Sequence, residues 1–176
     1  MNITTKQLAF EYLLTQMLKW GKETIPVVPN YTFTRLKALK MLFFASVVKN
    51  EQGEDLLDVF NNFYALPNGP VESDIYNLIT ADQLTYYSFK EFSITVKNDY
   101  KDVGLEDNLK QRIDSSISIL RQKNKMLLTY NAEQLVNLSH SWKSWQDSIQ
   151  IARALGKGSY RMDVNKIRTN TQIFAL

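Results

Sequence analysis

The chain has 176 residues, of which 44% are apolar and 12% aromatic, so it can bury one substantial core and is predicted to form a single domain, residues 1–176. It has no cysteine and one histidine, which excludes disulfides, thiolate metal sites and cysteine nucleophiles and offers too few ligands for a metal centre. It contains no apolar run of membrane-spanning length and begins without a signal-peptide pattern. We therefore expect a cytoplasmic protein that uses neither a membrane nor a cofactor.

The net charge of +3 is unevenly distributed along the chain. It is +5 over residues 1–50, −8 over residues 51–110 and +6 over residues 111–176. Such asymmetry can steer a charged partner, but we favour mutual neutralisation between elements that pack together in the fold. The basic C-terminal tail, residues 153–176, is expected to be solvated, with contact to nucleic acid or to an acidic protein surface as the alternative.

The first predicted helix covers residues 5–20, where apolar residues recur at helical spacing. Thr5 is expected to cap its N-terminus and Gly21 to terminate it. Pro26 and Pro29 then interrupt any regular structure and predict a loop.

A second helix is predicted from Thr32 or Thr34 to about Lys49, with leucine, phenylalanine and valine residues on one face. This apolar face indicates a helix of the core. Residues 54–62 are predicted to form a short helix that ends before the next turn.

Residues 63–71 read Phe-Tyr-Ala-Leu-Pro-Asn-Gly-Pro-Val and contain two of the four prolines. Proline fixes its own backbone angle and glycine adopts angles that other residues avoid, so the segment predicts a rigid turn of defined shape. The substitution Gly69→Val is therefore expected to cost stability through backbone strain. Pro70 is expected to lie in the first turn of another helix, because its missing N–H would be unpaired there. That helix carries the apolar residues Ile75, Leu78 and Ile79.

In the second half, residues 92–96 alternate between apolar and polar side chains and predict a short strand, with residues 172–175 as a candidate partner in a small hairpin. A helix is predicted over residues 106–125. Another is expected to run from an Asn131 cap to about Gly156. Its apolar positions form one stripe: Leu135, Leu138, Trp142, Trp145, Ile149 and Ala152. The predicted fold is thus a mainly α, compact single-domain helical bundle with a small β-hairpin as an optional element.

The sequence offers little for catalysis. His140 is the only histidine, and the serines beside it would point in different directions from one helix, so they predict no triad. Asp55 and Asp58 remain as clustered carboxylates without a motif. In a continuous helix His140 would lie opposite the apolar stripe, whereas a turn near Ser141 would let the imidazole bond a nearby backbone group. We predict a protein that is not an enzyme.

Three segments carry a family resemblance. They are the apolar run of residues 36–45, the Gly-Pro-Val turn leading into residues 74–78, and the Leu-x-x-Leu-Ser-His block of residues 135–140 with the tryptophans after it. In this order they resemble the SocA-like antitoxin domain, also called the Panacea domain, over about residues 33–150. The chain departs from the family pattern where Gln-Lys-Leu is common and Leu39-Lys40-Met41 stands here, and where Ser144 replaces a common proline. It also has Tyr-Ala-Leu-Pro-Asn, residues 64–68, in place of a tryptophan-tyrosine approach to the turn.

The resemblance implies a non-enzymatic antitoxin, of phage, prophage or chromosomal origin, that neutralises a cognate toxin by direct protein contact. In some members it implies delivery of the bound toxin to a protease. The alternative is a nucleic-acid-binding regulator that uses the basic N- and C-terminal regions. We predict that Asn68→Ala and Glu72→Ala leave folding unchanged and weaken the partner complex, and Trp142 is considered both as a core residue and as an interface anchor. The predicted partner-binding residues are Tyr64, Asn68, Gly69, Pro70, Glu72, Asp74, Tyr76, His140 and Trp142.

Overall fold

The computed structural model describes residues 3–24, 33–90, 93–101 and 104–169. These residues form a mainly α structure with a small β component, as predicted. The helices are α1 (Ile3–Thr24), α2 (Arg35–Val47), α3 (Ser73–Thr80), α4 (Asp107–Lys123), α5 (Ala132–His140), α6 (Lys143–Ala154), α7 (Val164–Thr169) and the 3₁₀ turn η1 (Leu127–Thr129). The strands are β1 (Phe63–Leu66), β2 (Gly69–Glu72), β3 (Tyr87–Phe89), β4 (Ile94–Val96) and β5 (Tyr160–Arg161).

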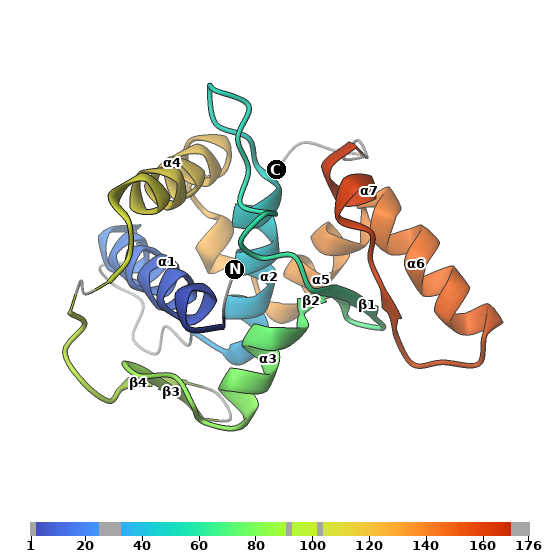
Figure 1. The fold of residues 1–176 in the computed structure, drawn as a ribbon, viewed down its shortest axis with the longest axis horizontal. Coiled ribbons are helices and arrows are strands. Elements are labelled where there is room, and N and C mark those ends of the chain that lie inside the picture. The colour runs from blue at the N-terminus through green and yellow to red at the C-terminus, as the bar shows by residue number, and fades with distance from the viewer. Residues whose placement is uncertain (1–2, 25–32, 91–92, 102–103, 170–176) are drawn as a thin grey trace.

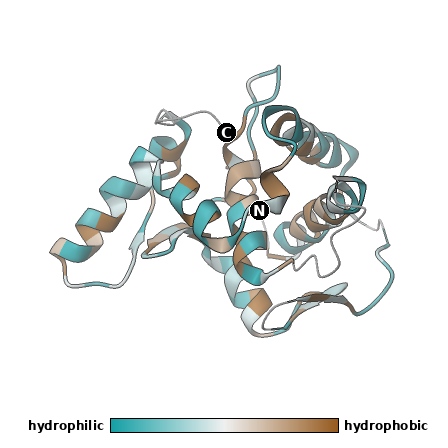
Figure 2. Ribbon diagram, turned by 180° about the vertical axis from the view of Figure 1, so that it is seen from behind, coloured by the Kyte–Doolittle hydropathy of each residue, from teal (hydrophilic) through white to brown (hydrophobic). Residues whose placement is uncertain are grey.

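Helix α2 passes through the middle of the molecule, with α1 and α4 on one side and β1, β2, α6 and α7 on the other (Figure 1). Every residue from Lys37 to Ser46 is buried, which is the pattern of a helix surrounded by protein. The predicted cap is present, since the Thr34 side chain accepts a hydrogen bond from the Lys37 backbone N–H at 3.2 Å. The outer helices α4 and α6 instead mix hydrophilic and hydrophobic residues along their length (Figure 2).

The predicted bounds of α1 are too narrow. The helix already includes Ile3, so Thr5 is not its cap, and it continues through Gly21 to Thr24. Gly21 is buried and does not take the left-handed conformation in which glycine ends a helix. Packing of α1 against α4 outweighs the local weakness of glycine in a helix. The predicted loop at Pro26 and Pro29 lies outside the described residues.

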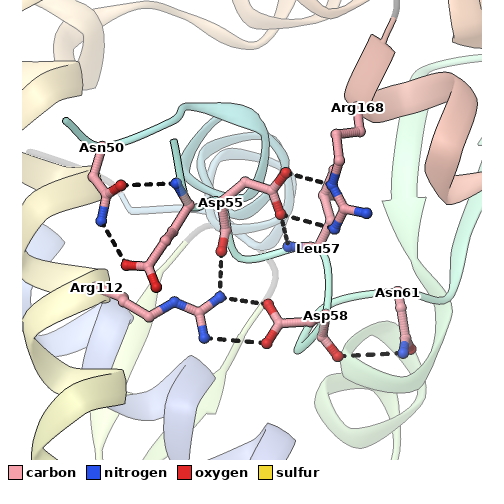
Figure 3. A network of polar contacts seen from close by, with 8 residues as sticks. Asn50, Asp55, Leu57, Asp58, Asn61, Arg112 and Arg168 are labelled. Atoms are coloured by element: carbon pink, nitrogen blue, oxygen red, sulfur yellow. Dashed lines mark hydrogen bonds and ion pairs between the residues drawn. The ribbon is translucent and has the colours of Figure 1, made fainter. Parts of the chain in front are cut away.

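The short helix predicted over residues 54–62 is wrong, because this segment consists of turns. Asp55 and Asn50 hydrogen-bond nearby backbone N–H groups, which competes with helix formation. Long-range ion pairs then hold the segment: Arg168 of α7 binds the Asp55 carboxylate, and Arg112 of α4 binds that of Asp58 (Figure 3). The two carboxylates considered as catalytic candidates are therefore each paired with an arginine.

Residues 63–72 form an antiparallel hairpin rather than an isolated turn. Strands β1 and β2 pair from Phe63 with Glu72 to Leu66 with Gly69, leaving Pro67 and Asn68 as the connecting residues. Strand β5 adds to the other edge of β1, so β2 is an edge strand. Pro70 was expected to start a helix but lies in β2, where an edge position tolerates proline.

Helix α3 begins after this strand. The Glu72 carboxylate caps it by accepting a hydrogen bond from the Ile75 N–H at 2.9 Å. The charged cap therefore places the helix start three residues beyond Pro70.

The predicted strand at residues 92–96 is confirmed over its described part, because Ile94–Val96 forms β4. It pairs with β3, from Tyr87 with Val96 to Phe89 with Ile94. The candidate partner, residues 172–175, and Phe92 lie outside the described residues.

The long helix predicted from Asn131 to Gly156 is interrupted at Ser141 and Trp142. The Trp142 backbone is extended and precedes α6, while its side chain is 2% exposed and its ring centroid lies 5.2 Å from that of Phe43 and 5.5 Å from that of Phe44. These contacts with α2 favour the break, since indole burial is a large stabilising term. The alternative of a turn near Ser141 is thus confirmed, and all six apolar positions of the predicted stripe are buried.

The Asn131 cap at the start of α5 can be tested by mutation. Its side chain accepts a hydrogen bond from the Gln134 N–H at 2.9 Å, and the Gln134 side chain accepts one from the Asn131 N–H at 2.9 Å. Asn131→Ala is expected to lower the free energy of unfolding by about 1 kcal/mol, the usual worth of such a cap. Urea denaturation checks this, with Asn137→Ala on the exposed face of the same helix as control. Equal midpoints for the two variants would contradict it.

The described part of the basic tail is not simply solvated. Strand β5 pairs with β1, and Met162 and Ile167 are buried. Arg168 donates hydrogen bonds to Asp55 at 2.7 and 3.0 Å. Together with the pairing of Arg112 with Asp58, this contact supports the interpretation that the basic flanks neutralise the acidic middle of the chain.

Candidate partner-binding surface

A buried ion cluster holds the base of the β1–β2 hairpin. The Lys6 ammonium lies 2.8 Å from Glu72 Oε1 and 2.5 Å from Asp74 Oδ2, and Glu72 is fully buried. Burial alone would lower the pKa of Lys6, but its hydrogen bonds to Asp74 and Glu72 and their negative charges outweigh this and raise it. Glu72 also accepts a hydrogen bond from the Asn62 N–H at 3.1 Å. These contacts contradict the expectation that Glu72→Ala leaves folding unchanged.

At the other end of the hairpin, the turn and α2 enclose a cavity of about 290 Å³, which we call the Lys40 pocket. Its lining is mostly aliphatic but also includes cationic and polar side chains. The residues around it are Arg35, Leu36, Leu39, Lys40, Leu66, Pro67, Asn68, Val71 and Tyr76. At the rim, the Arg35 guanidinium carbon lies 5.5 Å from the centroid of the Tyr76 ring, within the range of a cation–π contact. The pocket is at the small end of ligand sites and suits one or two side chains.

Lys40 is the unusual residue of this pocket. It is 2% exposed, and its Nζ donates one hydrogen bond, of 3.1 Å, to the Pro70 carbonyl. Within the described part of the chain no carboxylate forms an ion pair with it. Burial lowers the pKa of Lys40 to about 7, because the charged form loses its hydration. An ammonium has three donors, so two remain to be used.

Gly69 lets the hairpin approach this lysine closely. Its φ is +99°, a conformation that side chains disfavour. A Cβ at this position would lie 2.3 Å from Ser139 Oγ and 2.6 Å from Lys40 Nζ. The glycine is therefore required both by the backbone angle and by contact with α5 and α2.

His140 packs against the same turn. Its ring stacks on Trp145, with centroids 3.7 Å apart and planes at 6°. Trp145 Nε1 in turn donates a 3.0 Å hydrogen bond to the Leu66 carbonyl. The pKa of His140 is lowered, first by burial and then by the positive charge of Lys40, while a hydrogen bond to the Pro67 backbone acts in the opposite direction. The turn near Ser141 thus brings the imidazole close to the Pro67 backbone, while the buried His140 Nε2 has no hydrogen-bond partner among the described residues.

The predicted partner-binding residues form two groups, those at the Lys40 pocket and those away from it. Asn68 is exposed and Tyr76 half-buried, and both line the Lys40 pocket, while Gly69 and Pro70 lie behind its mouth in β2. The remaining residues lie apart from the pocket walls. Tyr64, Asp74 and His140 are half-buried, and Glu72 and Trp142 are buried among structural contacts.

Sequence reasoning missed Arg35 and Lys40 because both belong to a helix assigned to the core. One signal was available for Lys40. It interrupts an otherwise apolar run from Ala38 to Ala45, and a lysine in a fully buried segment is rare unless it is paired.

Among the described residues, the structure shows neither a metal-binding group nor a membrane-spanning helix. In the described ranges, no group of three or more His, Asp or Glu side chains is arranged to hold a metal ion. Among the described helices, none has the length and apolar character needed to cross a bilayer.

The fold and this surface define a mainly helical domain with an edge hairpin packed on a buried central helix. Residues 39–146 match the family model described as "Antitoxin SocA-like, Panacea domain". The match spans more than half of the chain, from within α2 to within α6, and the chain belongs to this family. A search of curated proteins gave no match, and a search of solved structures gave none either.

Proposed function

We propose that the protein is an antitoxin that neutralises a cognate toxin by direct, non-enzymatic protein contact in the cytoplasm. Membership of the SocA-like antitoxin family is the observation that carries this proposal. Such a role requires a stable scaffold and a shaped surface rather than a catalytic constellation. The β1–β2 hairpin supplies the shape, because its two ends are fixed by the Lys6 ion cluster and by the close packing of Gly69.

We place the contact surface at the mouth of the Lys40 pocket. Asn68, Tyr76 and Arg35 are proposed to touch the toxin, since they are exposed or half-buried around the opening. Gly69 and Pro70 are proposed to act through the shape of the turn. The other predicted residues, Tyr64, Glu72, Asp74, His140 and Trp142, are proposed to support the surface from their half-buried or buried positions.

The test is co-expression of the chain with the product of the adjacent gene, with growth and co-purification at moderate salt as readouts. Growth rescue and a stable complex are expected. A harmless neighbour that does not co-purify would contradict the proposal. The half-life of the toxin in the presence and absence of the chain then separates neutralisation by binding from delivery to a protease.

Asn68 gives the site-specific version of this test. Asn68→Ala is expected to weaken the complex by up to about tenfold, the effect of losing one hydrogen bond, without changing the melting temperature. Asn137→Ala, an exposed asparagine on α5, is the matched control. Isothermal titration calorimetry with the purified toxin measures both. Unchanged affinity in the Asn68 variant would remove the turn from the interface.

Nucleic-acid binding by the basic regions has less support than toxin binding. Lys6, Arg112 and Arg168 are each paired with a carboxylate of the same chain, which reduces the positive charge available to phosphates. A steep loss of duplex DNA affinity with rising salt would restore this alternative.

A further inference from the structure

We propose that the Lys40 pocket binds the C-terminal residue of the toxin, with the terminal carboxylate on the Lys40 ammonium and the side chain against the aliphatic walls. The identity of the partner rests on the proposed function, whereas the chemistry of the pocket rests on Lys40 and the residues that line the pocket with it.

Burying Lys40 is costly to the folded protein. A lysine that is 2% exposed, with one hydrogen bond to a carbonyl and no ion pair to another described residue, is unfavourable in the isolated protein. A methionine of similar length would fill the same space without this cost. The buried cation therefore suggests a role that the fold of the free chain does not require.

The charge of the pocket favours an anionic ligand. Arg35 and Lys40 both line the pocket and are both cationic, and none of the described residues that line it is acidic. Both belong to α2, whose positive N-terminal end at Arg35 adds to the same field. An anionic group is the ligand that these charges favour, and a carboxylate can use the donors that Lys40 leaves free.

The lining of the pocket is largely aliphatic and favours a ligand that also carries an apolar group. Leu36, Leu39, Leu66 and Val71 line the same cavity as Lys40, which has a volume of about 290 Å³. A glutamate side chain would bring a carboxylate on a short stem and leave most of this aliphatic surface uncovered. A C-terminal residue presents a carboxylate and an apolar side chain from a single Cα, and no chain has to leave the pocket beyond it. We therefore assign the pocket to a chain terminus.

The pocket is tested with small probes that need no toxin. N-acetyl-leucine carries the proposed carboxylate and side chain, and N-acetyl-leucinamide is identical except that it lacks the charge. In an NMR titration of the full chain at pH 6.5, N-acetyl-leucine is expected to bind in the millimolar range and shift the amide signals of residues 35–40 and of the non-proline residues within 66–71. The amide is expected to bind at least about tenfold more weakly, because it loses the charge-assisted hydrogen bond.

Several outcomes would overturn the assignment. Equal affinity for acid and amide would show that the cation is not used, and no shift up to tens of millimolar would show that the pocket is closed to this ligand. Tighter binding of N-acetyl-glutamic acid α-amide, which carries only a side-chain carboxylate, would refute the assignment to a chain terminus. These comparisons use the unmodified protein and do not depend on any variant folding.

The pH dependence of the affinity for N-acetyl-leucine provides a second test. The titratable or charged groups facing Lys40 are Arg35 from α2, Tyr76 from α3 and His140 from α5. Because burial places the pKa of Lys40 at about 7, its charged form is depleted as the pH rises above that value. The affinity for N-acetyl-leucine is therefore expected to fall by up to about tenfold per pH unit above pH 7. An affinity that stays constant between pH 6 and pH 9 would contradict the role of Lys40.

The variant Lys40→Met links the pocket to the toxin. It is expected to melt at the same or a higher temperature, to lose the preference for acid over amide, and to bind the toxin at least about tenfold more weakly. Full toxin affinity in this variant would overturn the proposal, even if the antitoxin function itself were established. Conversely, a chain that binds N-acetyl-leucine as expected but no toxin would refute the proposed function and leave the chemistry of the pocket supported.

Discussion

Replacing Gly69 with valine is expected to lower the free energy of unfolding by about 3 kcal/mol, combining the strain of a positive φ with overpacking at a closed site. The φ of +99° disfavours any β-branched residue, and the new Cβ would lie 2.3 Å from Ser139 Oγ. Since Gly69 joins the hairpin turn to α2 and α5, the pocket should be distorted as well. Chemical denaturation measures the stability, and binding of the toxin measures the surface.

Gly53 provides a control that separates the cost of backbone strain from the cost of steric conflict. Gly53 also has a positive φ, of +79°, but no atom lies within 4 Å of the position of its Cβ. Gly53→Val is therefore expected to show the cost of backbone strain without the collision and to keep toxin affinity. If both variants lost the same stability, the close packing behind Gly69 would carry no energy and its proposed role in shaping the turn would be wrong.

Replacing Glu72 with alanine is expected to cost about 3 kcal/mol, because removal of one partner leaves a buried charge and unpaired donors. Glu72 accepts hydrogen bonds from Lys6 and from the backbone N–H groups of Asn62 and Ile75. Asp74 keeps a bond to Lys6, which holds the loss toward the lower end of the range for buried pairs. Thermal and urea denaturation check the prediction.

Asp74→Ala is the matched control, since it removes the other carboxylate from the same lysine. The Asp74 side chain is 31% exposed, and solvent screens its interaction, so the expected loss is only about 1 kcal/mol. A loss in Glu72→Ala no larger than that in Asp74→Ala would show that the capping and hairpin contacts of Glu72 contribute little.

Local patterns predicted the elements whose structure is determined locally. The Thr34 cap, the Asn131 cap and helix α4 all depend on residues within a few positions of one another. Elements that depend on distant contacts were assigned less well. Pro70 follows the pairing of β1 with β2 rather than its own preference for a helix start, and Trp142 interrupts a helix because its ring packs on Phe43 and Phe44.

The candidate surface was likewise predicted where it depends on neighbouring residues and missed where it depends on distant ones. The unusual composition of residues 63–71 indicated a shaped turn, and it led to Asn68 and Tyr76 at the mouth of the pocket. No local pattern predicts that Lys40 meets that turn, because the contact joins α2 to β2 across 30 positions of the chain. Burial of Glu72 was likewise invisible, since it depends on Lys6 in α1, 66 positions away.

The most direct test of the central proposal is the affinity between the purified chain and the purified product of its adjacent gene, measured by isothermal titration calorimetry at moderate salt. Neutralisation by direct contact predicts a saturable complex with a submicromolar Kd. The absence of any binding at tens of micromolar of both proteins, with both shown to be folded, would contradict it.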